Sequence, residues 1–300
     1  MCGIVGLHLR DPELHPRLGV LLAGMLGQVV ERGPDSAGVA VYGDPRLTPV
    51  GHSAVSLLDA GMPASKVAEI VGAALGIPAD AIQADETVVV NAATEPEMLL
   101  AAVSKALPDA LVIGSGRSLA VLKGVGNPDR LAESFGLASV QGWQAVAHTR
   151  MATESAVTAA GSHPFSVGLD QCLVHNGSFS NHATIRRELR ATGVSFDSEN
   201  DSEVGARFVA QRMLEGCDLE KALRLLYERF DGFYTLLVTS GDSFAVVRDA
   251  IACKPAIIAE TEQWVAMASE YRALDTLPGI EDARIFEPEP EEVYLWRLLR

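Results

Sequence analysis

The second residue of the chain, Cys2, could do the most distinctive chemistry. Removal of Met1 would leave Cys2 with a free α-amino group beside its own thiol. An α-amino group titrates near pKa ~8 and a thiol near ~8.5, so part of the amine is unprotonated near neutral pH and can accept the thiol proton. One residue would then supply both nucleophile and base. The alternative is an ordinary buried strand at the N-terminus, in which Cys2 is only a small hydrophobic residue.

Four polar clusters follow Cys2 along the chain. They are Arg32-Gly33-Pro34-Asp35-Ser36, His148-Thr149-Arg150-Met151-Ala152-Thr153, His175-Asn176-Gly177 and Asn200-Asp201-Ser202-Glu203. Each cluster has a simple structural explanation: Asn176-Gly177 suits a hairpin turn, Arg150 could be a surface charge, and Asp201 could cap a helix. Such clusters are also typical of strand ends and loops, where functional sites are usually built.

With Cys2 in front, the order and wording of these clusters resemble the class II glutamine amidotransferases, whose glutaminase domain has an N-terminal nucleophile. The resemblance implies that Cys2 forms a γ-glutamyl thioester and that Asn176 and the backbone N–H of Gly177 form the oxyanion hole. It also implies a substrate-binding set. In that set Arg150 binds the α-carboxylate of glutamine and Asp201 binds its α-ammonium group. Arg32 supports the nucleophile pocket, and His175 is a further substrate-binding residue.

Composition limits the classes of partner and ligand. The chain has 300 residues and a formal net charge of −15, which argues against nucleic acid or an anionic membrane as partner. It has neither a signal peptide pattern nor an apolar run long enough to span a bilayer, so we expect a cytoplasmic protein. Four cysteines without a C-x-x-C pair indicate no disulfide framework and no metal site.

The resemblance also implies the fold that must position these residues: an α+β, four-layer αββα sandwich of the N-terminal-nucleophile hydrolase type. We expect this domain to span residues 1–300, with an α/β insertion at residues 51–144. Hydrophobic patterning predicts strands and helices in both parts. The predicted strands are 4–7, 39–42, 54–58, 87–90, 110–113, 119–122, 233–239, 244–248, 256–259, 264–268 and 293–296, and the predicted helices are 17–31, 64–75, 95–106, 181–191 and one from about 200 to 214. The insertion is either extra fold volume or a docking surface for partner chains.

The resemblance extends along most of the chain to the separate amidotransferase-like subunits of bacterial glutamate-synthase-type complexes, in particular N-methylglutamate synthase (methylamine-glutamate N-methyltransferase). It is carried by residues 248–255, 266–274 and 287–290. This implies glutamine or glutamate as substrate and a hetero-oligomer with partner synthase subunits. The partner subunits are expected to carry FMN and an iron–sulfur cluster, and this chain is expected to carry no cofactor. The alternatives are the glutaminase subunit of an ammonia-channelling glutamate synthase, a hydrolase acting on another amide, and a catalytically silent scaffold.

Overall fold

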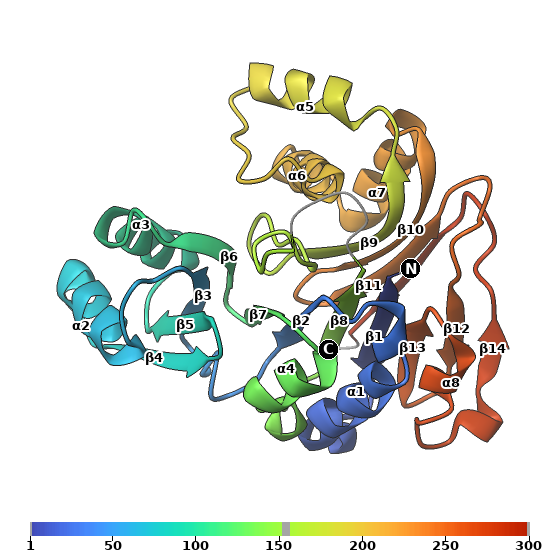
Figure 1. Ribbon diagram of the computed structural model, residues 1–300, viewed down its shortest axis with the longest axis horizontal. Helices are drawn as coiled ribbons and strands as arrows, with labels where there is room; N and C mark the ends of the chain where they lie inside the picture. Colours follow the sequence, from blue (N-terminus) through green and yellow to red (C-terminus); the bar gives the residue numbers. More distant parts are fainter. Residues whose placement is uncertain (1, 152–156, 299–300) are drawn as a thin grey trace.

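The computed structural model describes residues 2–151 and 157–298, and this part of the chain contains three β-sheets (Figure 1). The largest sheet has seven strands in the order β14-β12-β13-β1-β8-β2-β7. They are β14 (Arg284–Phe286), β12 (Ile257–Glu260), β13 (Trp264–Ala268), β1 (Gly3–Leu9), β8 (Gln144–Arg150), β2 (Ser36–Tyr42) and β7 (Leu119–Val125). The second sheet has four strands in the order β15-β11-β10-β9. They are β15 (Val293–Arg297), β11 (Ser243–Arg248), β10 (Gly232–Thr239) and β9 (Cys172–Phe179).

These two antiparallel sheets form the middle layers of a sandwich. Alternation along β1 sends Ile4 into the apolar layer between the sheets and Val5 to the opposite face. The inter-sheet layer also contains Val146 of β8 and Val174 of β9. It brings residues far apart in the sequence into one core.

Helices cover the outer face of each sheet (Figure 1). The large sheet is covered by α1 (Leu18–Gly27), α4 (Pro128–Ser134) and α8 (Tyr271–Leu274), and the four-stranded sheet by α5 (His182–Ala191), α6 (Asp201–Leu214) and α7 (Leu219–Arg229). Short 3₁₀ turns complete the chain: Pro12–Arg17, Val30–Arg32, Leu137–Ser139 and Ile280–Asp282. The order helix, sheet, sheet, helix is the predicted four-layer arrangement.

The third sheet has the order β4-β5-β3-β6 and is covered by two helices, α2 and α3. Its elements are β3 (Ser53–Leu58), α2 (Ala64–Leu75), β4 (Ala79–Ala84), β5 (Thr87–Ala92), α3 (Pro96–Ala106) and β6 (Leu111–Gly116). Other elements from residues 51–144 belong to the sandwich, because β7 pairs with β2 and α4 packs against α1 and β2.

Several expected elements differ from the observed ones. The first long helix is shorter than expected, since α1 ends at Gly27 and a 3₁₀ turn follows at Val30–Arg32. The hairpin alternative for His175-Asn176-Gly177 is wrong: all three residues lie inside β9 and pair with β10. The expectations did not include β4, β8, β9, β14, α4, α7 and α8.

Within residues 2–151 and 157–298, no helix combines the length and apolarity needed to cross a bilayer.

Candidate active site

The site is built around the start of β1, where the chain enters the large sheet between β8 and β13. Two side chains from these neighbours hold the first backbone N–H groups. Thr149 Oγ1 accepts from Gly3 N at 3.2 Å, and Ser269 Oγ accepts from Ile4 N at 2.9 Å. Gly3 permits this packing, because a Cβ there would lie 2.7 Å from Thr149 Oγ1. The half-buried Cys2 is therefore held at a defined place.

Two of the predicted residues converge on the backbone of Cys2. Arg32 Nε donates to the Cys2 carbonyl oxygen at 3.0 Å, and the Asn176 side-chain amide donates to the same oxygen at 3.5 Å. Arg32 comes from the turn after α1, whereas Asn176 comes from β9 in the other sheet. The nucleophile position is thus bound from both sides of the inter-sheet space.

Glu270 belongs to this arrangement and was given no role by sequence reasoning. Its Oε1 lies 2.8 Å from Arg32 Nη1, and its Oε2 lies 2.6 Å from Arg272 Nε. Burial alone would raise the pKa of the Glu270 carboxyl, but the hydrogen bond from Arg32 and the charges of both arginines lower it. The sequence feature that could have identified Glu270 is its position, because it follows the end of β13 at Ala268 by two residues.

Gly177 lies where the backbone of β10 approaches β9 very closely. Its φ is +149°, and a Cβ at this position would lie 2.0 Å from the Phe233 carbonyl oxygen. Only glycine avoids that overlap. The glycine therefore lets β9 remain paired at the point where Asn176 projects toward Cys2.

Arg150 ends β8 and is buried, with 7% of its surface exposed. Its backbone pairs with Ser36, and its carbonyl accepts from Asp35 N at 3.1 Å. Gly33 makes this approach possible, because a Cβ there would lie 2.4 Å from the Thr149 carbonyl carbon. The Arg32–Ser36 turn and the end of β8 therefore pack against each other and form one side of the site.

Asp201 and His175 lie together on the helical side of β9. Asp201 Oδ2 accepts from Phe179 N at 2.8 Å, so this carboxylate joins the end of β9 to the first turn of α6. His175 Nδ1 is 2.8 Å from Ser202 Oγ, and its ring stacks on Phe179 with centroids 4.3 Å apart. Burial lowers the pKa of His175 to about 4, against the opposing charge of Asp201.

The structure therefore separates the predicted residues into two groups. Cys2, Arg32 and Asn176 meet at one carbonyl oxygen, with Gly177 next to Asn176 in β9. His175 points to the opposite face of β9 from Asn176, because neighbouring strand residues alternate. Their catalytic and substrate-binding roles stay predictions. Met1, Ala152 and Thr153 of the predicted motifs lie outside the described residues.

This arrangement suits chemistry by an N-terminal thiol. Cys2 lies at the start of a strand, and the Asn176 amide donates to its carbonyl oxygen. The end of β8 beside the Arg32–Ser36 turn carries the buried Arg150. Within residues 2–151 and 157–298, no group of three or more histidine, cysteine, aspartate or glutamate side chains is placed to hold a metal ion.

The chain is similar to known proteins along most of its length. Residues 148–276 match the glutamine amidotransferase domain family. The chain is 47% identical to the glutamine amidotransferase-like protein GlxB of Rhizobium meliloti (strain 1021), over 99% of this chain and 98% of that protein. It is 28% identical to a putative glutamine amidotransferase of Methanothermobacter thermautotrophicus, over 98% of this chain and 99% of that one.

Among solved structures, the glutamine phosphoribosylpyrophosphate amidotransferase from B. subtilis superimposes with a TM-score of 0.55 at 18% identity. The match covers 99% of this chain but 49% of that one, so the chain spans about half the length of that enzyme. The likeness confirms the predicted α+β sandwich fold.

Proposed function

The chain belongs to the glutamine amidotransferase-like proteins, and we propose that it cleaves the side-chain amide of glutamine with Cys2 as nucleophile. The observation that carries this proposal is the convergence of Arg32 and Asn176 on the Cys2 carbonyl oxygen. It holds the thiol-bearing residue beside an amide that can donate to an oxyanion. A strand that served only as structure would not need these two long-range contacts.

The proposed reaction has two steps. The Cys2 α-amine, free once Met1 is removed, takes the thiol proton, and the thiolate attacks the amide carbon. The Asn176 amide and the Gly177 N–H stabilise the resulting oxyanion. The carbon–nitrogen bond then breaks, and the protonated amine returns its proton to the departing ammonia. Water next attacks the thioester, which releases glutamate and restores the thiol.

Substrate binding is assigned to two charged residues, Arg150 and Asp201. A planar guanidinium such as Arg150 can bind an α-carboxylate through two parallel hydrogen bonds. Asp201 supplies a carboxylate for the α-ammonium group, and its side chain is 21% exposed although Phe179 N occupies one oxygen.

Intact-mass analysis tests the nucleophile. The mass of the purified protein should show that Met1 has been lost. Treatment with a glutamine-analogue electrophile should then add one covalent adduct, which peptide sequencing maps to Cys2. Cys2→Ala should lose the adduct, whereas Cys253→Ser, which removes an exposed thiol, should retain it. A protein that retains Met1 and takes no adduct would contradict the proposal and favour a silent scaffold.

We propose further that the chain is the amidotransferase-type subunit of a glutamate-synthase-like complex, namely N-methylglutamate synthase. This enzyme forms N-methylglutamate from methylamine and glutamate and releases ammonia. The proposal is supported by the sequence resemblance at residues 248–255, 266–274 and 287–290. The partner subunits would carry FMN and the iron–sulfur cluster.

Purification of the tagged chain from its native cells tests this assignment. A co-purifying complex with flavin and iron–sulfur absorbance should form N-methylglutamate from methylamine. If the complex instead forms glutamate from 2-oxoglutarate and glutamine, the chain serves an ammonia-channelling glutamate synthase. If the isolated chain hydrolyses glutamine but no complex forms, the glutaminase assignment stands and the subunit assignment fails.

A further inference from the structure

The segment that carries Glu270 is bound to the start of β1. Ser269 N donates to the Ile4 carbonyl oxygen at 2.9 Å, and Ser269 Oγ accepts from Ile4 N at the same distance. These two hydrogen bonds join the chain after β13 to the backbone two residues beyond Cys2. Glu270, which follows Ser269, is therefore held at a fixed place relative to the N-terminal residues.

The short helix α8 does not account for a glutamate at this position. Glu270 is the N-cap residue of α8, but its side chain makes no capping hydrogen bond. Serine, threonine, aspartate and asparagine are preferred at helix N-caps, because their short side chains reach the first N–H groups of the helix. The Glu270 carboxylate is instead directed at two arginine side chains.

Each oxygen of this carboxylate contacts one arginine. Oε1 lies 2.8 Å from Arg32 Nη1, and Oε2 lies 2.6 Å from Arg272 Nε. Although burial has the opposite effect, these two arginines hold the pKa of the Glu270 carboxyl below its usual value, so it is ionised at neutral pH. The Arg32 side chain is only 12% exposed, whereas that of Arg272 is 46% exposed. Glu270 thus supplies the negative charge that balances a mostly buried guanidinium.

Arg32 connects Glu270 to Cys2. Its Nε donates to the Cys2 carbonyl oxygen at 3.0 Å, and its Nη1 donates to Glu270. Its Nη2 is buried and has no hydrogen-bond partner among the described residues. Because the guanidinium is a rigid plane, a partner that fixes Nη1 also fixes the direction in which Nε donates. Glu270 therefore sets the orientation of the donor that holds Cys2.

We propose that Glu270 is a positioning residue for glutamine hydrolysis, which acts through Arg32 to fix the carbonyl group of Cys2. The inference rests on the proposed function, because it concerns Cys2 as a nucleophile. Once Met1 is removed, Cys2 ends the chain and no preceding residue anchors its backbone. The Cys2 carbonyl oxygen can be held without occupying the α-amine that serves as base. Arg32 and Glu270 hold this oxygen and thereby orient the thiol and the amine.

Steady-state kinetics of glutamine hydrolysis test this role. Glu270→Gln preserves the shape of the side chain but removes its charge, so the guanidinium loses its fixed direction. We expect kcat to fall by about 10–100-fold with KM changed by less than about twofold, because orientation is lost and substrate binding is not. Glu31→Gln is the matched control. It removes an exposed carboxylate beside Arg32 in the sequence and should leave both constants unchanged.

A double-mutant cycle distinguishes positioning through Arg32 from a general loss of stability. Lysine at position 32 has a single ammonium group and cannot reproduce the two directed hydrogen bonds of the guanidinium. In the Arg32→Lys background, Glu270→Gln should therefore lower kcat by less than about twofold. Equal reductions of kcat in the two backgrounds would show that Glu270 does not act through Arg32 and would overturn the inference.

A crystal structure of the unchanged protein with the glutamine-analogue adduct on Cys2 tests the inference without a variant. Arg32 should keep its contacts to both the Cys2 carbonyl oxygen and Glu270, and the loss of either contact would overturn the inference. An unchanged protein that neither hydrolyses glutamine nor forms the adduct contradicts the proposed function itself. An active unchanged protein with an equally active Glu270→Gln variant overturns only the role of Glu270.

Discussion

At the residue scale, the contact between Asn176 and Cys2 is the most informative feature of the site. Asn176 reaches the Cys2 carbonyl oxygen at 3.5 Å from the opposite sheet. If the Asn176 amide also stabilises the oxyanion, the stabilisation that it provides is greatest in the transition state. The residue should therefore affect the turnover rate more than the affinity for glutamine.

Asn176→Ala is expected to reduce kcat for glutamine hydrolysis by about 10²–10³-fold with little change in KM. Initial rates over a range of glutamine concentrations measure both quantities. The half-buried Asn181 supplies the control, because Asn181→Ala removes an amide whose side-chain hydrogen bonds go to Arg229 and Asp231 beside α7. An unchanged kcat in Asn176→Ala would remove it from the oxyanion hole.

Gly177 allows a prediction about stability that is independent of catalysis. Gly177→Ala should lower the free energy of unfolding by more than about 1 kcal/mol, because the new Cβ would overlap the Phe233 carbonyl oxygen. Gly51→Ala is the matched control: its φ is also positive, at +81°, but nothing lies within 4 Å of the added Cβ. Urea denaturation of both variants separates the overlap from the backbone strain. Equal losses would contradict the role of the close approach.

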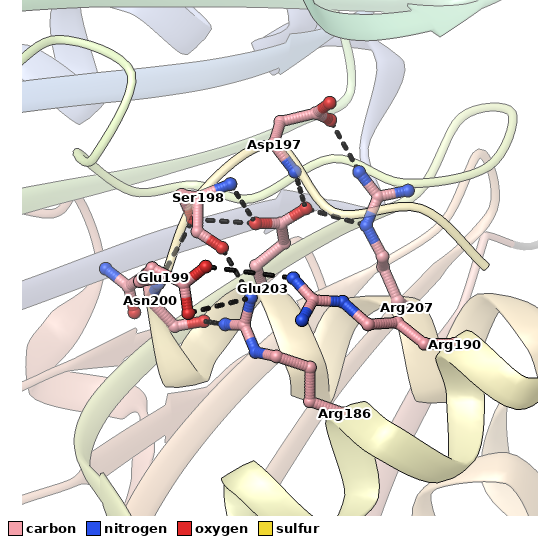
Figure 2. A network of polar contacts seen from close by, with 8 residues as sticks. All are labelled: Arg186, Arg190, Asp197, Ser198, Glu199, Asn200, Glu203 and Arg207. Atoms are coloured by element: carbon pink, nitrogen blue, oxygen red, sulfur yellow. Dashed lines mark hydrogen bonds and ion pairs between the residues drawn. The ribbon is translucent and has the colours of Figure 1, made fainter.

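At the element scale, the junction between the 197–200 loop and α6 positions Asp201. Asn200 caps the helix by accepting from Ser202 N at 2.9 Å, and Glu203 holds the preceding loop (Figure 2). Burial would raise the pKa of Glu203, but the hydrogen bonds from Ser198, Asp197 and Arg207 lower it. The helix start and the loop are thus joined by one charged side chain.

Glu203→Gln should destabilise the protein by roughly 2 kcal/mol, since hydrogen bonds to a charged group are weakened and Arg207 loses a buried partner. It should also raise KM for glutamine more than it lowers kcat, because Asp201 is displaced. Urea denaturation and steady-state kinetics provide the two measurements. Glu215→Gln, at the exposed end of the same helix, should change neither. A normal KM in Glu203→Gln would show that the loop does not position Asp201.

At the scale of the whole molecule, buried histidines between the layers link stability to pH. Burial lowers the pKa of His148 to about 3 and of His175 to about 4, and it also lowers that of His163. Arg150 and Lys123 add to the shift of His148, whereas Asp201 opposes that of His175. The unfolded chain, with histidine pKa values near 6.5, binds these protons first as pH falls.

Stability should therefore be full above pH ~6.5 and should decrease as pH falls toward ~4, because protons favour the unfolded state in that window. Thermal unfolding from pH 7.5 to 4.5 measures this. His148→Gln should show a shallower decrease than the unchanged protein. Identical pH profiles would mean that His148 does not contribute to the linkage.

Much of the fold follows from local patterns in the sequence. The helix predicted at residues 64–75 is α2 as observed, because its apolar side chains recur at helical spacing and bury Val67 and Val71. Helix α7 has the same kind of pattern, with Leu219, Leu223 and Leu226 buried, and could have been predicted too. Strand β4 is different: its half-exposed residues have weak strand preference, and it forms by pairing with β5.

The sequence by itself determined the family resemblance, the candidate residues and most element positions, because these depend on residue type and local spacing. Only the tertiary structure decided that Arg32 binds both Cys2 and Glu270, which is 238 residues away. It also decided that Asn176 and His175 face different layers and that Lys123 is buried. Such contacts depend on strand register and on the stacking of sheets, and local propensity carries no information about either.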